Sequence, residues 1–179
     1  LSMPARDPKA QEKIDINKEL ASIMENAVQF YKMQFNGSNA KSAKAYIKSR
    51  GLTEDIVNTF EIGFAPNDRV SLSQFLLNKG VKENKIIDAG LAIKPDDGGN
   101  IFDRFRGRIM FPIRNTQGRC IAFGGRAMDP NARAKYLNSN ETALFDKGRS
   151  LYNHATAREA SGKANCGLPG RRRQRGVPR

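Results

Sequence analysis

Three arginines alternate with other residues immediately before an apolar segment. Arg104, Arg106 and Arg108 lie within residues 103–108, and the apolar residues 109–113 follow. In an extended chain, side chains two residues apart point to the same side, so the three guanidinium groups would form one cationic row. Such groups repel one another, but each can donate two hydrogen bonds to a phosphate. The row predicts a phosphate-binding surface, with a charged, solvated edge strand as the alternative.

Two further segments carry groups suited to anions. Gly124 and Gly125 end an apolar strand just before Arg126, so a ligand could approach the backbone closely beside a guanidinium group. In the other segment, Lys135 and Lys147 flank a polar loop rich in amide and hydroxyl groups. The alternatives are an ordinary glycine turn and a solvated loop. Both segments therefore remain candidate phosphate contacts.

Groups suited to metal binding or nucleophilic catalysis are sparse. The carboxylates are scattered and form no acidic cluster of the kind that holds two Mg²⁺ ions for nucleotidyl transfer. Two cysteines, Cys120 and Cys166, are too few for a zinc site and do not suggest a disulfide scaffold. His154 has no catalytic pattern around it. The sequence favours binding over chemistry.

The composition predicts a polyanionic partner. Among 179 residues, 31 lysines and arginines face 18 acidic residues, which gives a formal net charge of +13 and a pI of about 10.1. Nucleic acid and an acidic membrane surface are the usual partners for such a surplus. No apolar run is long enough to span a bilayer, and the polar start does not resemble a signal peptide. We therefore expect a cytoplasmic protein without membrane contact.

Helical periodicity dominates the first half of the chain. Residues 1–15 are polar, contain two prolines and are predicted to form a linker. Apolar spacings of three and four over residues 16–35 predict an amphipathic helix that Gly37 ends. Shorter helices are expected at residues 40–49, from Thr53 to about residue 60, at 71–78 and at 82–89.

The period changes in the second half. Residues 109–113 and 120–123 are short apolar strands around a turn, which predicts a hairpin. Residues 64–67 are expected to break the regular structure, and residues 155–163 are expected to be helical. The predicted fold class is α+β: N-terminal helices, then a small mixed or antiparallel sheet with a basic face.

Five segments together resemble, in order, the bacterial DnaG-type DNA primases. They are residues 46–52, 60–66, 103–113, 123–126 and 135–139, and the resemblance covers roughly residues 17–163. This family makes short RNA primers on single-stranded DNA. Its catalytic core pairs a basic N-terminal subdomain with a Toprim subdomain that binds metal ions. The resemblance assigns residues 16–163 to the basic subdomain.

The resemblance also implies roles, cofactors and partners. The groups that hold template, primer or incoming nucleotide would be Arg50, Arg104, Arg106, Arg108, Arg126, Lys135, Asn138 and Lys147. The full-length enzyme would use Mg²⁺ or Mn²⁺ on carboxylates outside this chain, and zinc in an upstream domain. Its partners would be single-stranded DNA, RNA primer, nucleoside triphosphates and, through another region, the replicative helicase. We expect this chain alone to bind nucleic acid without making primers.

Two features depart from the family, and two other functions stay open. Asn140 stands where the family has proline, and the arginine-rich residues 164–179 replace an apolar strand that leads to Glu-Gly-Tyr. A one-base shift in reading frame could restore that strand, so a frameshift is our hypothesis for the tail. The chain could instead be a non-catalytic basic nucleic-acid-binding module. It could also be a nucleotide-binding protein that uses Gly124 and Gly125.

Overall fold

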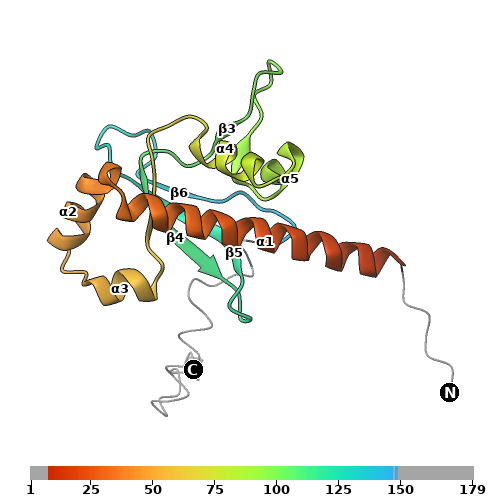
Figure 1. Ribbon diagram of the computed structural model, residues 1–179, viewed down its shortest axis with the longest axis horizontal. Coiled ribbons are helices and arrows are strands. Elements are labelled where there is room, and N and C mark those ends of the chain that lie inside the picture. The colour runs from red at the N-terminus through yellow and green to blue at the C-terminus, as the bar shows by residue number, and fades with distance from the viewer. Residues whose placement is uncertain (1–7, 147, 149–179) are drawn as a thin grey trace, which may run out of the picture.

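The computed structural model describes residues 8–146 and residue 148, coloured in Figure 1. Several predictions lie outside these residues: those for Lys147, His154 and Cys166, for residues 1–7 of the linker, for the helix at 155–163 and for the tail at 164–179.

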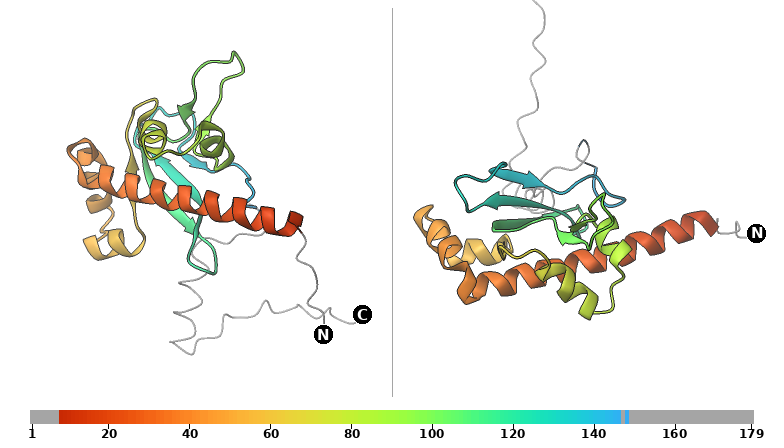
Figure 2. Two further views of the ribbon diagram at one scale, coloured as in Figure 1. Left: turned by 45° about the vertical axis from the view of Figure 1, so that its right-hand side comes forward. Right: turned by 90° about the horizontal axis from the view of Figure 1, so that it is seen from above.

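A long helix, α1 (Pro8–Asn36), lies along one side of the sheet (Figures 1 and 2). Its buried side chains follow the predicted spacing and include Leu20, Met24 and Tyr31. The predicted start at residue 16 was wrong. The first turns of α1 are exposed, with Ile14 59% accessible, and they are rich in helix-forming Lys, Gln and Glu. Periodicity cannot reveal a helical segment that buries no apolar face.

Four short helices and a 3₁₀ turn follow, close to the predicted positions. The side chain of Thr53 accepts a hydrogen bond from the amide of Ile56, which confirms the predicted N-cap. The elements are η1 (Ser38–Ala40), α2 (Lys41–Ser49), α3 (Glu54–Thr59), α4 (Ser71–Asn78) and α5 (Glu83–Asp88).

The sheet is antiparallel throughout, with strand order β1-β4-β5-β6. Its strands are β1 (Gly63–Ala65), β4 (Arg108–Arg114), β5 (Cys120–Ala127) and β6 (Tyr136–Asn138), and a separate ribbon pairs β2 (Ala92–Ile93) with β3 (Phe102–Asp103). The α+β class and the β4–β5 hairpin are therefore confirmed. The break expected at residues 64–67 was wrong for its first two residues, because Phe64 pairs with Ile109. A strand this short shows no measurable alternation.

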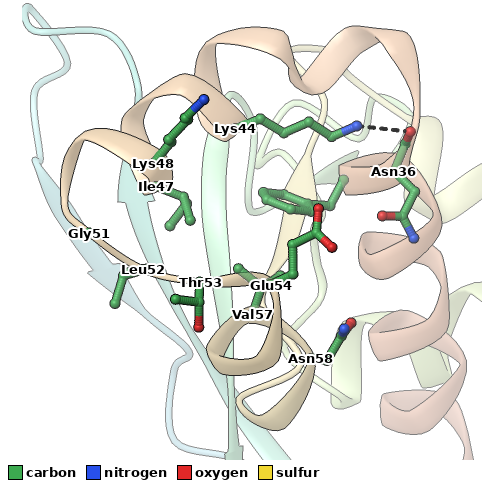
Figure 3. A pocket seen from close by; sticks show the side chains of 11 residues that line it. Asn36, Lys44, Ile47, Lys48, Gly51, Leu52, Thr53, Glu54, Val57 and Asn58 are labelled. Atoms are coloured by element: carbon green, nitrogen blue, oxygen red, sulfur yellow. Dashed lines mark hydrogen bonds between the residues drawn. The ribbon is translucent and has the colours of Figure 1, made fainter.

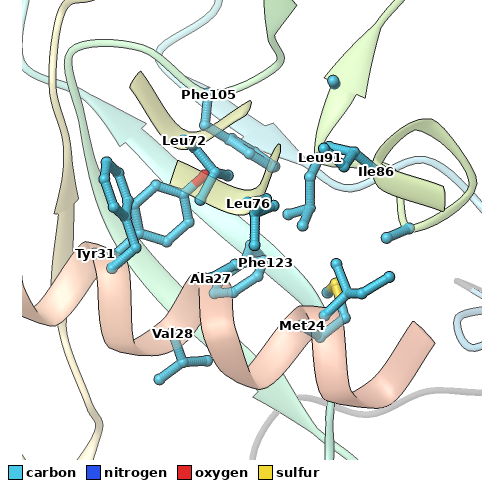
Figure 4. Packing of buried hydrophobic residues seen from close by; sticks show 14 of the residues in the cluster. Met24, Ala27, Val28, Tyr31, Leu72, Leu76, Ile86, Leu91, Phe105 and Phe123 are labelled. Carbon is cyan, nitrogen blue, oxygen red and sulfur yellow. The ribbon is translucent and has the colours of Figure 1, made fainter. Parts of the chain in front are cut away.

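The sheet has two differently covered sides. Phe123 of β5 meets Tyr31 of α1 edge to face, 5.3 Å between centroids, in a cluster that includes Leu72 and Phe105 (Figure 4). On the opposite side, Phe64 and Ile109 join a second cluster with residues of α2. This second cluster covers the β1–β4 half of that side. On the β5–β6 half, the paired side chains Arg126 and Tyr136 share this side.

Arg114 of β4 links the sheet to Glu25 of α1 and to Glu61, which lies just before β1. The guanidinium group of Arg114 donates to both carboxylate oxygens of Glu25, at 2.6 and 3.1 Å, and to Glu61. Glu25 also accepts from the amide of Cys120. Burial raises the pKa of Glu25, but the hydrogen bonds from Arg114 and Cys120 outweigh burial and hold it below its ordinary value. The network fixes the register between helix and hairpin.

Candidate nucleic-acid interface

The three alternating arginines do not form a row on one strand. β3 ends at Asp103 and β4 begins at Arg108, and the residues between them form a bend in which Gly107 has a φ of 56°. The predicted row was therefore wrong. Its premise was an extended backbone, and a left-handed glycine turns the chain before the last arginine.

Asp103 holds this bend in place. Its buried carboxylate accepts hydrogen bonds from the amides of Leu72 and Ser73, at 2.7 and 2.9 Å, and thus caps the N-terminus of α4. The N-cap residue of α4, Val70, supplies no side-chain cap. Burial raises the pKa of Asp103 despite these hydrogen bonds. Sequence reasoning missed this role, because the partners lie about thirty residues away in the chain.

The three arginines in and after the bend contact different neighbours. Arg104 donates to the carbonyl of Asn138 at 3.0 Å, and this bond connects the bend to β6. The guanidinium carbon of Arg106 lies 5.2 Å from the ring centroid of Phe102. Arg108 donates to the carbonyl of Ala134 at 2.9 Å. Arg104 and Arg108 thus support the loops around the sheet, while Arg106 is exposed.

Arg50 and Arg126 converge on one aromatic ring from distant parts of the chain. The guanidinium carbon of Arg126, on β5, lies 3.7 Å from the ring centroid of Tyr46, on α2. That of Arg50 lies 5.2 Å from the same centroid, and its Nε donates to the Tyr46 hydroxyl at 2.9 Å. The sequence signal for Tyr46 was its position four residues before Arg50 on a helix. Its contact with β5 could not be predicted from that spacing.

The two glycines of β5 face opposite sides of the sheet. A Cβ on Gly125 would lie 3.0 Å from Phe105 and 3.1 Å from Arg108, so this glycine permits close packing under the sheet. A Cβ on Gly124 would meet the Asn138 side chain at 3.3 Å on the other side. The expectation that both glycines admit a ligand therefore fails for Gly125.

β6 adds a cation and an exposed ring beside Arg126. Tyr136 is the cross-strand partner of Arg126 and is 67% accessible. Lys135 is exposed, with its amino group 5.9 Å from the Tyr136 centroid. The loop expected between the two lysines was wrong for residues 136–138, which form an edge strand. We call the surface opposite α1 that is formed by Gly124, Arg126, Tyr136 and Asn138 the open face.

Among the described residues, the arginines around the open face form no ion pair with a carboxylate. Within residues 8–146, the arginine that forms ion pairs is Arg114, which lies elsewhere. Burial lowers the pKa of Arg104, and nearby Arg108 lowers it further, although both remain charged at neutral pH. The buried Nε groups of Arg104 and Arg126 lack acceptors in the described structure. Buried donors without acceptors destabilise the folded chain, and an anionic ligand could supply the missing acceptors.

Two hollows border this region. One, of about 700 Å³, lies between α1, α2 and α3, where Lys44 donates to the carbonyl of Asn36 (Figure 3). It touches none of the predicted ligand residues. The other, of about 900 Å³, lies at the ends of β1, β4 and β5, and Arg106 and Arg108 line it. In the part of the chain that the structure describes, no group of three His, Cys, Asp or Glu side chains could hold a metal ion. Across the same residues, none of the helices is long and apolar enough to cross a membrane.

The sequence matches the family described as DNA primase catalytic core, N-terminal domain, over residues 30–158. The DNA primase of Deinococcus radiodurans is 38% identical over 156 residues, which are 87% of this chain and 26% of that protein. The DNA primase of Pseudomonas aeruginosa is 43% identical over 141 residues, 78% of this chain and 21% of that protein. The chain therefore spans about a quarter of the length of these relatives.

The fold is similar to those of solved primase cores. A DnaG primase catalytic domain bound to ssDNA has a TM-score of 0.74 and 37% identity, over 83% of this chain and 46% of that one. The RNA polymerase domain of Mycobacterium tuberculosis DnaG, in complex with a double-stranded DNA that has a 6-nucleotide overhang, has a TM-score of 0.76 and 29% identity, over 82% and 46%.

Proposed function

The chain belongs to the family of the DNA primase catalytic core N-terminal domain, and from this premise we propose that it is the nucleic-acid-binding part of a bacterial DNA primase. In this role it grips single-stranded template and the growing RNA primer by their phosphates. The complete enzyme would join nucleoside triphosphates into short primers for replication in the cytoplasm, beside the replicative helicase. The relatives named DNA primase and the DNA-bound structural neighbours support this proposal.

The observation that carries the proposal is the pairing of unneutralised arginines with aromatic rings around the open face. Guanidinium groups can contact phosphates, and a ring such as that of exposed Tyr136 can stack on an unpaired base. Arginines and exposed rings together suit a single-stranded nucleic acid, because its phosphates and its unpaired bases are both accessible. Asn138 is part of this surface, Lys135 and Arg50 border it, and all three are proposed as further contacts. Lys147 is proposed on the resemblance alone.

The catalytic metals belong elsewhere in this proposal. Nucleotidyl transfer needs clustered carboxylates that hold Mg²⁺ or Mn²⁺, and the acidic groups of the described residues do not fit that need. Glu25, Glu61 and Asp103 are engaged in structural hydrogen bonds. We therefore assign the metal ions to another part of the full-length primase, and zinc to its upstream domain.

A binding assay that includes nucleotides separates this function from its alternatives. The chain should bind a fluorescently labelled 20-nucleotide single strand, and millimolar ATP should not displace the strand. It should form no primers from Mg²⁺, template and nucleotides. Primer synthesis by the chain alone would contradict the assignment of the metals. Tighter binding of ATP than of DNA would favour a nucleotide-binding protein, and loss of DNA binding on removal of residues 170–179 would favour a module that depends on its tail.

A further inference from the structure

A second pair of arginines shares an aromatic ring away from the open face. The guanidinium carbons of Arg69 and Arg106 lie 4.9 and 5.2 Å from the ring centroid of Phe102. Arg69 comes just before α4, Arg106 lies in the bend after β3, and Phe102 belongs to β3, beside α4 (Figure 1). Arg69 lies outside the five segments that resemble the primases, so the resemblance gives it no role.

The two carboxylates that line the same hollow as this pair accept hydrogen bonds from the backbone. Asp68 accepts a hydrogen bond from the amide of Val70, and Asp129 accepts one from the amide of Asn131, both at 2.8 Å. Neither forms an ion pair with an arginine among the described residues. Among the described residues, two exposed cations are thus held against one ring without a direct ion pair. The π face of the ring attracts each of them, but an anion would relieve their mutual repulsion.

The hollow at the ends of β1, β4 and β5 extends from this pair to helix α2, which carries Tyr46. Arg69 and Arg106 line it on one side and Ser42 of α2 on another. Ser42 lies one helical turn before Tyr46, the ring that holds Arg126. A strand that crosses the open face can therefore continue into the hollow and reach the second pair.

We propose that Arg69 and Arg106, held by the ring of Phe102, form a second phosphate-binding site for the same single strand. The inference rests on the proposed function and extends it by one contact. The site takes a backbone phosphate, to which two guanidinium groups can donate several hydrogen bonds. Phe102 is a positioning residue, since it orients the arginines and does not itself contact the phosphate.

The test compares Arg69→Gln with Arg119→Gln. Arg119 is an exposed arginine at the β4–β5 turn, at the opposite end of these strands from the hollow. Fluorescence anisotropy with a labelled 20-nucleotide oligothymidylate should show about threefold to tenfold weaker binding for Arg69→Gln, and a salt slope about 0.7 shallower, as for one lost phosphate contact on a single strand. Arg119→Gln should stay within about twofold of the wild type.

Two further variants test the arrangement. Arg69→Lys keeps the charge but loses the planar fork, and Phe102→Leu keeps both arginines but removes the ring. Both variants should lose less affinity for DNA than Arg69→Gln does. The melting temperature should not change in Arg69→Lys, because Arg69 is exposed. For Phe102→Leu, the melting temperature shows how much of any affinity loss comes from reduced stability.

The outcomes separate this inference from the proposed function. If Arg126→Gln weakens DNA binding while Arg69→Gln behaves like Arg119→Gln, the second site is wrong and the proposed function stands. If the wild type does not bind the strand, the proposed function fails. Tripolyphosphate distinguishes the phosphate source. If Arg69→Gln abolishes tripolyphosphate binding and leaves DNA binding intact, the site takes free nucleotide phosphates and the strand assignment is overturned.

Discussion

The position of Arg126 is set by a contact between elements that are distant in the sequence. It leaves β5 on the side opposite α1 and rests on the ring of Tyr46. Replacing it with glutamine removes the proposed charge-assisted phosphate contact without changing a buried apolar group. We expect affinity for single-stranded DNA to fall roughly tenfold, or about 1.4 kcal/mol. Anisotropy titration measures this loss, and an effect no larger than that of Arg119→Gln would remove Arg126 from the interface.

Tyr46 allows the ring to be tested separately from its hydroxyl. Tyr46→Phe removes the acceptor of the Arg50 hydrogen bond but keeps the surface on which Arg126 rests. Tyr46→Leu removes both. We expect the first variant to bind DNA within about threefold of the wild type and the second to bind about tenfold more weakly. Equal losses in the two variants would show that stacking does not position Arg126.

Motif and charge predicted candidate phosphate-binding side chains, among them Arg104, Arg106 and Arg126, and these roles remain predictions. Spacing along the chain predicted their surroundings poorly. Asp103 has the appearance of a surface carboxylate next to arginines, yet it is buried as the cap of α4. Such partners are brought together by tertiary packing, which spacing along the chain does not record.

At the scale of elements, the Asp103 cap links helix α4 to the arginine bend. Asp103→Asn keeps the shape but loses one of the two oxygens that accept backbone amides. The free energy of unfolding should fall by about 1–2 kcal/mol in urea denaturation. Asp96→Asn, at an exposed turn position, is the matched control and should change it by less than about 0.5 kcal/mol. If Asp103→Asn leaves the free energy of unfolding unchanged, the carboxylate does not hold the bend in place.

The ion pair between Glu25 of α1 and Arg114 of β4 makes a pH-dependent contribution to the free energy of unfolding. The pKa of Glu25 lies below its ordinary value, so the unfolded chain binds this proton more tightly, and the stabilisation is present at neutral pH and lost on acidification. Because Glu25 is 41% exposed, we expect Glu25→Gln to cost only about 1 kcal/mol at pH 7.

That difference between wild type and Glu25→Gln should vanish between about pH 6 and pH 3. Asp103 has the opposite sign, because its raised pKa favours the folded state at low pH. Comparing the two proteins in urea at each pH cancels the Asp103 contribution. A difference that stays constant with pH would contradict the role of the Glu25 charge.

The elements that sequence patterns missed are short or exposed. Helix α4 was predicted at its observed bounds, since its apolar side chains repeat with helical spacing. β1 and β6 have three residues each and are recognised only through their partners on β4 and β5. β1 also depends on its contact with α1. A Cβ on Gly63 of β1 would lie 2.5 Å from the Cβ of Tyr31, so this close contact requires glycine.

At the scale of the whole molecule, the interface is a product of strand order. The order β1-β4-β5-β6 places β5 between the hairpin partner and the edge strand, and α2 covers only the β1–β4 half of the open side. Tyr136 is therefore left exposed, and Arg126 beside it is half-buried against the Tyr46 ring of α2. The hairpin was predictable from the sequence, but the positions of β1 and β6 on either side of it were not.

The salt dependence of binding tests the central claim most directly, because it counts neutralised phosphates. The logarithm of the affinity for a labelled 20-nucleotide single strand should fall linearly with the logarithm of salt concentration, by about 0.7 for each phosphate contact. With three to five such contacts, the slope should be about −2 to −3.5, and it should be shallower in Arg126→Gln. A slope near zero, or one that Arg126→Gln leaves unchanged, would contradict it.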